Sequence, residues 1–199
     1  VECGSANVFC ATNGQISTPA LKPYMLAGIT RDFTIQTIHM LKLPFVERDI
    51  SLDELKQADE IWHAGDIGNI SVSDKLKKFA FLRAVWGNID NIKIRTEFKE
   101  TLCFECERVK VLMTHIGGYP GKYSAKIHPV IKKEKPNLFI SGHSHILKVI
   151  YDQNHKLLHM NPGAIGNYGI HKVKTILSFK IRDSKIKDLK VIEFKKEED

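Results

Sequence analysis

Short apolar runs alternate with polar and glycine-containing turns along most of this chain. Short runs with such boundaries are typical of buried strands, whereas apolar residues three and four positions apart indicate helices. Several runs lead directly into residues with reactive or metal-binding side chains; these runs span residues 60–62, 82–86, 109–113 and 138–140. Because functional side chains gather at the carboxyl ends of neighbouring strands, we expect the residues that follow these runs to lie close together.

The strand ends supply carboxylate, amide and imidazole groups. The motifs are Gly65-Asp66, Gly87-Asn88, Thr114-His115 and Gly142-His143-Ser144-His145. Oxygen and imidazole ligands in this combination suit first-row divalent metals such as Mn, Fe, Zn or Ni. They also suit chemistry at phosphate, where metal ions stabilise the attacking and leaving oxygens. The sequence therefore predicts a metal site made of Asp66, Asn88, His115, His143 and His145.

The remaining pattern predicts helices mostly early in the chain and strand pairs mostly late. Ser51 and Glu54 form a capping box at the start of a short helix. Ser73 is expected to cap a second helix that runs to Phe79 and buries Leu76 and Phe79. A third helix is predicted over residues 123–133, and strand pairs are predicted over residues 97–113, 147–159 and 171–194.

The order of the motifs, GD, GN, H and GHxH, resembles that of the calcineurin-like metallophosphoesterase superfamily, and within it most closely the small bacterial YfcE-like phosphodiesterases. The stretches 114–122 and 159–163 add to the resemblance, which runs from about residue 51 to about residue 194. It implies an α+β, layered fold, a β-sandwich of two mixed sheets flanked by helices. We expect residues 1–44 to be an atypical N-terminal segment of the same domain and residues 45–199 to be the metallophosphoesterase domain.

The resemblance also implies a role for each motif residue. Two metals share a bridging aspartate, here Asp66, and the second metal takes the equivalents of Asn88, His115 and His143. The first metal takes the equivalent of His145 together with an Asp-x-His pair at the end of the first strand. No Asp-x-His pair occurs upstream of Asp66 in this sequence.

Three interpretations of the missing pair stay open. The N-terminal region supplies other ligands, such as Asp32 or His39; or the site holds a single metal, with activity reduced or lost; or the first part of the chain is not the natural sequence of this domain. The third interpretation is supported by the sequence itself, since residues from about 51 onward read as ordinary family sequence and residues 1–44 do not.

A further departure concerns proton transfer to the leaving group. Many phosphatases of the superfamily carry a histidine after the GN dipeptide, where this chain has Ile89. An isoleucine transfers no proton, so we expect a preference for substrates with good leaving groups, because general acid help is typically worth about a hundredfold or more. The next residue, Asp90, either orients a ligand or water from behind the site or is a turn carboxylate exposed to solvent.

The function that the resemblance implies is a metal-dependent phosphodiesterase that hydrolyses phosphodiester bonds through a metal-bound hydroxide. Asp66, Asn88 and His115 are the expected catalytic residues, and manganese is the first expectation for one or two ions, with Ni, Fe, Zn or Mg as alternatives. The alternative function is a catalytically impaired scaffold of the same fold that binds partner proteins, like the small retromer subunit. Metal content discriminates between the two.

Composition indicates the size of the domain and limits the expected partners. The chain has 199 residues, enough for one domain with a full core, and a net charge of +7. The lysines are spread over polar faces, so nucleic acid is not an expected partner except as a substrate, and homo-oligomer formation is left open. The chain has no apolar run of membrane-spanning length, and residues 1–30 lack the features of a secretory signal.

The cysteines complete the picture from composition. The chain has four of them, Cys3, Cys10, Cys103 and Cys106. Cys103-x-x-Cys106 lacks a second pair at zinc-finger spacing, so reduced structural thiols are expected. This usage fits a cytoplasmic protein.

Overall fold

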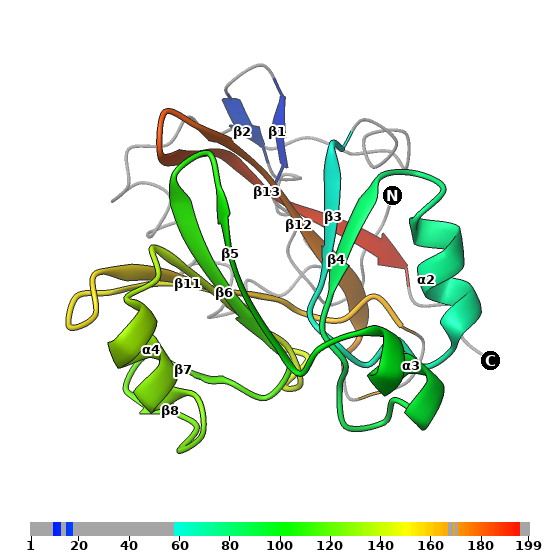
Figure 1. Cartoon of the computed structure of the whole chain (residues 1–199). Helices are drawn as coiled ribbons and strands as arrows, with labels where there is room; N and C mark the ends of the chain where they lie inside the picture. Colours follow the sequence, from blue (N-terminus) through cyan, green and yellow to red (C-terminus); the bar gives the residue numbers. More distant parts are fainter. Residues whose placement is uncertain (1–9, 13–14, 18–57, 167–168, 170, 196–199) are drawn as a thin grey trace. The chain divides into compact units, whose positions relative to one another are not determined.

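The computed structural model describes residues 10–12, 15–17, 58–166, 169 and 171–195 (Figure 1). The chain divides into two compact units. The first unit comprises residues 1–50, 144–150 and 161–199, and the second comprises residues 51–143 and 151–160. The predicted helix that begins at Ser51 lies outside the described residues.

The second unit begins with a parallel strand pair joined by a helix. Strands β3 (Glu60–His63) and β4 (Phe81–Ala84) pair in parallel, and helix α2 (Ile70–Leu76) connects them. The helix begins earlier than predicted because Asn69, whose Oδ1 accepts the Ser71 N–H, is its cap. The prediction that Ser73 is the cap and Phe79 is buried is wrong: Ser73 lies within the helix, and Phe79 is 57% exposed beyond its end.

A second short helix follows β4 and supports the next motif. Helix α3 (Ile92–Glu97) is capped by Asn91, whose Oδ1 accepts the Ile94 N–H. Glu97 was predicted to begin a strand and instead ends this helix. Ile94 is fully buried in a cluster with Ile67 and Ala84, so the helix is fastened to the strand pair by apolar packing.

The largest sheet has five strands in the order β10-β11-β9-β6-β5. The strands are β5 (Thr101–Cys106), β6 (Val109–Thr114), β9 (Leu138–Ser141), β10 (Leu147–Asp152) and β11 (Leu157–Pro162). Strands β6, β9 and β11 are parallel, and β5 pairs with β6 antiparallel across a tight turn. Glu107 and Arg108 both have positive φ in that turn, as a type I′ hairpin requires. The mixed pairing agrees with the predicted mixed sheet.

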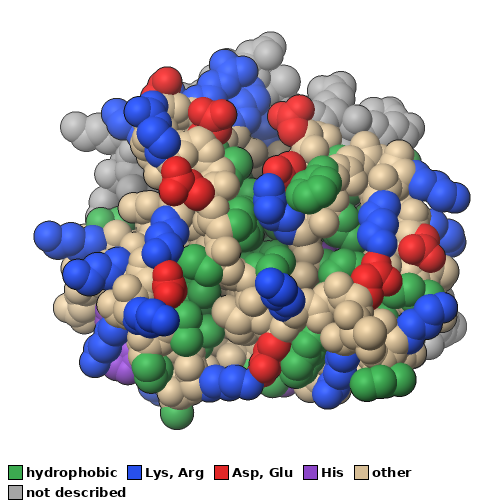
Figure 2. Space-filling model, viewed as in Figure 1, with side chains coloured by type: hydrophobic (Ala, Val, Ile, Leu, Met, Phe, Trp, Pro, Cys, Tyr) green, Lys and Arg blue, Asp and Glu red, His purple; other side chains and the backbone are tan. Residues whose placement is uncertain are grey.

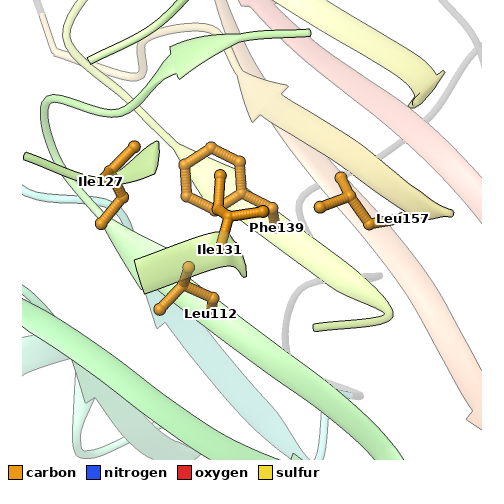
Figure 3. Packing of buried hydrophobic residues seen from close by; sticks show 5 residues of the cluster. All are labelled: Leu112, Ile127, Ile131, Phe139 and Leu157. Carbon is orange, nitrogen blue, oxygen red and sulfur yellow. The ribbon is translucent and has the colours of Figure 1, made fainter. Parts of the chain in front are cut away.

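Helix α4 (His128–Glu134) covers part of this sheet with an apolar face (Figure 3). Its cluster consists of Leu112, Ile127, Ile131, Phe139 and Leu157, each of which is at most 3% exposed. The helix is shorter than predicted because the preceding residues form a small hairpin, β7 (Gly118–Tyr119) and β8 (Lys122–Tyr123). Buried β-branched and aromatic side chains fix the strands that end at the predicted site.

The first unit contains two antiparallel hairpins. Strands β1 (Cys10–Thr12) and β2 (Gln15–Ser17) form a short one. Strands β12 (Val173–Arg182) and β13 (Lys185–Lys195) form a long one with an irregularity between Ser178 and Lys180, which confirms the predicted final hairpin. Within the described ranges, no helix is both long and apolar enough to cross a membrane. Figure 2 shows lysines and arginines scattered among acidic and apolar side chains on one face.

Candidate metal centre

Four of the five predicted ligands lie in loops that follow strands of the second unit. Asp66 follows β3, Asn88 follows β4, His115 follows β6 and His143 follows β9. The last residues of β4, β6 and β9 are buried, namely Ala84, Thr114 and Ser141, so packing holds these strand ends in place. The arrangement is the one predicted from the apolar runs.

The four side chains are connected through Oδ1 of Asn88 and Nε2 of His115. This Oδ1 atom lies 3.0 Å from Nε2 of His115 and 2.9 Å from Nδ1 of His143. Nε2 of His115 is also 3.2 Å from Oδ1 of Asp66. The rings of His115 and His143 stand nearly perpendicular, with 5.2 Å between their centroids.

The second nitrogen of His115 fixes which atom faces the cluster. Its Nδ1 lies 2.8 Å from the carbonyl oxygen of Ala64, which can only accept a hydrogen bond, so Nδ1 carries the proton. In the neutral ring, Nε2 then presents its lone pair to the oxygens of Asp66 and Asn88. A backbone carbonyl that orients an imidazole in this way is the usual support of a metal-binding histidine.

These distances fit a bound divalent cation. Bonds of about 2.1 Å in octahedral geometry place neighbouring ligand atoms about 3.0 Å apart. The three separations that join Asp66, His115, Asn88 and His143 run from 2.9 to 3.2 Å. A cation would also offset the repulsion between a lone pair and the oxygens that face it. Among the described residues, no group of three or more His, Cys, Asp and Glu side chains is placed to hold a metal ion, so the candidate set includes the amide oxygen of Asn88 as a ligand.

Glycines before the ligands allow the loops to pack this closely. A Cβ atom on Gly87 would overlap the backbone nitrogen and carboxylate of Asp66. A Cβ atom on Gly65, which also has a φ of 90°, would overlap the ring of His115. The Gly-Asp and Gly-Asn dipeptides are therefore requirements of close approach between the ligand loops.

Two of the ligands have strained backbones. Asp66 has a φ of 58° and His143 a φ of 68°, in the left-handed region that residues with a side chain rarely adopt. Such a conformation costs about 1–3 kcal/mol and persists where the surroundings hold it. Strain of this kind clusters at functional sites, which agrees with a metal centre at these residues.

Comparison with known families identifies the larger part of the chain. Residues 43–184 match the family model of the calcineurin-like phosphoesterase superfamily domain. The chain belongs to this superfamily. A probable metallophosphoesterase of Methanocaldococcus jannaschii is 29% identical over 142 residues, which are 71% of this chain and 71% of that protein. The YfcE-like subfamily stays a prediction.

Solved structures confirm the predicted fold. An archaeal phosphodiesterase has a TM-score of 0.56 at 19% identity, and the match covers 83% of this chain and 95% of the phosphodiesterase. Zinc-bound Vps29 from Entamoeba histolytica has a TM-score of 0.56 at 18% identity, and the match covers 73% of this chain and 88% of Vps29. The chain thus has the metallophosphoesterase fold, as predicted.

The beginning of the chain resembles a different family. Residues 1–71 match the model of class IV aminotransferases. A probable branched-chain-amino-acid aminotransferase of Synechocystis is 36% identical over 78 residues, and one of Bacillus subtilis is 42% identical over 57 residues. The chain spans only 26% and 16% of these two relatives. The two family matches overlap at residues 43–71, and the Asp-x-His pair of the phosphoesterases was expected near residues 42–44, at the start of this overlap.

The fifth predicted ligand of the phosphoesterase site, His145, belongs to the first unit. Its ring lies 5.1 Å from the ring of His171, centroid to centroid, at an interplanar angle of 80°. The structure thus places Asp66, Asn88, His115 and His143 together, and it places the ring of His145 beside the ring of His171. The alternative ligands Asp32 and His39 lie outside the described residues.

Asp90 is buried rather than exposed, so the second of its two predicted interpretations is wrong. The side chain is 3% exposed, and its carboxylate accepts the N–H groups of Gly68 and Gly87, each at 2.7 Å. Arg95, which the sequence did not single out, donates to the carbonyl oxygens of Asp90 at 2.7 Å and Asn88 at 2.9 Å. Its only sequence signal is a cation in the helix that follows the GN motif.

Histidines and cysteines outside the cluster have structural surroundings. Burial lowers the pKa of His63, and the negative charge of Asp90 opposes this shift. His159 is buried, and its Nε2 lies 3.0 Å from Oγ of Ser141.

Cys103 and Cys106 are free thiols three residues apart on β5, where side chains three apart point to opposite faces. Burial raises the pKa of both thiols, which agrees with reduced structural cysteines.

Proposed function

We propose that this phosphoesterase is a metal-dependent phosphodiesterase. The observation that supports the proposal is the grouping of four side chains. Oδ1 of Asn88 lies 3.0 Å from Nε2 of His115 and 2.9 Å from Nδ1 of His143, and Nε2 of His115 lies 3.2 Å from Oδ1 of Asp66. Oxygen and imidazole ligands in this set suit manganese, which is the ion we propose first. When bound there, the cation supplies a Lewis acid for the phosphoryl group and lowers the pKa of water at the site.

The protein groups have separate roles in this proposal. Asp66 supplies the negative charge that balances the cation. His115 keeps its orientation through the bond of Nδ1–H to Ala64, so Nε2 remains available as a ligand. The planar amide of Asn88 turns its oxygen toward both rings, which directs its N–H donors away from them, where a phosphoryl oxygen can accept.

The residue after Asn88 sets the substrate preference that we propose. The Ile89 side chain is 63% exposed, and its backbone N–H lies 3.3 Å from Oδ1 of Asp66, so the residue borders the cluster. It offers an approaching diester apolar contact but no proton for the leaving oxygen. Diesters whose leaving group is a phenolate or another weakly basic oxygen are therefore the substrates that this site hydrolyses best.

The test is hydrolysis of bis(p-nitrophenyl) phosphate with added Mn²⁺. We expect Asp66→Ala and His143→Ala to abolish turnover, since each removes a ligand. His128→Ala is the matched control, because His128 lies at the start of α4, outside the cluster, and should keep wild-type turnover. Full activity in either purified ligand variant would refute the assignment.

A partner-binding scaffold is the second candidate. Ile89 in place of a proton donor and the lack of an upstream Asp-x-His pair favour it, because both remove parts of the hydrolytic machinery. A scaffold of this kind would neither bind Mn²⁺ in calorimetric titration nor hydrolyse the aryl diester. Binding together with hydrolysis would exclude it as the main function.

A further inference from the structure

Two loops that carry metal ligands are tied together by one buried carboxylate. Asp66 lies in the loop after β3, and Asn88 lies in the turn after β4. Asp90 accepts the N–H of Gly68 in the first loop with Oδ1 and the N–H of Gly87 in the second with Oδ2. Each distance is 2.7 Å, at the short end for such bonds, as is usual when the acceptor is charged.

The two bonds act at points next to the ligands. Gly87 directly precedes Asn88, and Gly68 is two residues beyond Asp66. A single rigid carboxylate therefore fixes how far apart the two loops lie. The Ile89 N–H, which is 3.3 Å from Oδ1 of Asp66, joins the same two loops through the ligand itself.

Arg95 holds the turn after β4 by donating hydrogen bonds to backbone carbonyl groups of that turn. Its Nε donates to the Asp90 carbonyl at 2.7 Å, and one Nη atom donates to the Asn88 carbonyl at 2.9 Å. The guanidinium carbon lies 4.5 Å from the centroid of the Trp86 ring, so the side chain is held in place by stacking. The backbone of Asn88 is thus fixed through its neighbours on both sides.

We propose that Asp90 and Arg95 are positioning residues that set the separation of Asp66 and Asn88 and thereby the metal affinity of the site. This inference rests on the metal site of the proposed function and not on the hydrolytic step. Groups that orient metal ligands from behind typically change affinity or activity by about ten- to a hundredfold when they are replaced. Here the oriented element is the backbone of two ligand loops.

The experiment compares Mn²⁺ affinity with stability in Asp90→Asn. The amide can accept only one of the two N–H groups, so the loops lose one tie while the volume is conserved. We expect calorimetric titration of the folded variant to show Mn²⁺ affinity about ten- to a hundredfold below wild type. Saturating Mn²⁺ should restore much of its turnover of the aryl diester, because the ligands themselves are intact.

Two controls separate positioning from a purely structural role. Ile131→Val removes a methyl group from the core cluster around α4, and should lower the melting temperature while leaving Mn²⁺ affinity unchanged. Asp74→Asn replaces an exposed carboxylate on α2 and should change neither quantity. Wild-type Mn²⁺ affinity in folded Asp90→Asn overturns the inference.

A second variant keeps the inference testable if Asp90→Asn does not fold. Arg95→Gln acts at an exposed side chain and removes the fork that holds the Asn88 and Asp90 carbonyls. We expect a severalfold loss of Mn²⁺ affinity in the folded protein, and an unchanged affinity counts against positioning. Failure of the wild-type chain to bind Mn²⁺ is a different result, which refutes the metal site and the inference together.

Discussion

At the scale of single residues, the ligands of the candidate centre depend on the glycines beside them. Gly87 has no room for a Cβ atom because the backbone and carboxylate of Asp66 lie against it. A Cβ atom on Gly166, by contrast, would have no other described residue's atoms packed within 4 Å of it, its chain neighbours apart. The same substitution at the two positions therefore has different physical consequences.

We expect Gly87→Ala to displace Asp66 and to lower both Mn²⁺ affinity and aryl diester turnover by at least about tenfold, the size expected when a ligand loop is disturbed. Gly166→Ala is the control and should leave both quantities near wild type. Calorimetric titration and steady-state kinetics measure the two effects. Equal behaviour of the variants would mean that the ligand loops do not need their close packing.

Ile89 provides a second prediction at this scale. Ile89→His places an imidazole beside the cluster, where it can protonate a leaving oxygen. We expect kcat/KM for an alkyl diester, which has a poor leaving group, to rise by about tenfold or more, with little gain for the aryl diester. The gain should disappear as the pH rises above about 7, because the imidazole loses its proton. A similar change for both substrates would argue against a leaving-group effect.

At the scale of elements, a carboxylate at the end of β10 connects this strand to β8. Asp152 is 4% exposed and accepts the Tyr123 hydroxyl at 2.6 Å, while Nδ1 of His155 lies 2.9 Å away. Burial alone would raise the pKa of Asp152, but the hydrogen bonds from Tyr123 and His155 outweigh it and hold that pKa below its usual value. Burial also raises the pKa of Tyr123, so its hydroxyl stays protonated and donates.

Tyr123→Phe should lower the free energy of unfolding by about 1–3 kcal/mol at neutral pH, because a hydrogen bond to a buried charged group is lost. The folded-state pKa of Asp152 is depressed, so its contribution is present above the unfolded pKa and is lost as the pH falls through the folded pKa. The difference between wild type and variant should therefore shrink in acid. Urea denaturation at neutral and at acidic pH measures it, and a constant difference would exclude the ionised carboxylate as the cause.

Elements also show where patterns in the sequence mislead. Ser73 has the residue type of a cap, yet Asn69 caps α2, and the Ser73 hydroxyl donates to the Ile70 carbonyl at 2.7 Å within the helix. Both residues satisfy backbone groups, so residue type alone does not decide between them. The predicted third helix begins later because Tyr123 pairs within β8. Helix ends depend on neighbouring contacts that lie beyond the local pattern.

At the scale of the whole molecule, the chain combines matches to two families. The phosphoesterase match starts at residue 43, whereas residues 1–71 match the aminotransferases. Of the three interpretations of the missing Asp-x-His pair, a first segment foreign to this domain agrees best with these matches. A foreign first segment also favours a single-metal site, because it lacks the Asp-x-His pair that the resemblance assigns to the other metal, whereas the four clustered ligands all lie inside the phosphoesterase match.

We therefore expect about one Mn²⁺ per chain after saturation and removal of excess metal, measured by elemental analysis of the purified protein. His115→Ala should lose the Mn²⁺ affinity, because Nε2 of His115 lies 3.0 Å from Oδ1 of Asn88. A single-metal site of Asp66, Asn88, His115 and His143 predicts that His145→Ala keeps most of it. Two ions per chain, one of them lost in His145→Ala, would show that other residues complete a second site.

The sequence by itself indicated the superfamily and the fold, which the comparisons confirm, and it named the four residues that the structure brings together at the candidate metal centre. It could do so because each ligand directly follows an apolar run, and the packing of such runs into parallel strands delivers their ends to one place. The tertiary structure alone decided which neighbours support these ligands. For Asp90 the sequence left two interpretations open, and Arg95 carried no motif, because their partners are backbone groups of loops up to 22 residues away. Backbone hydrogen bonds of this kind leave no pattern in the sequence, since every residue type except proline offers the same donor.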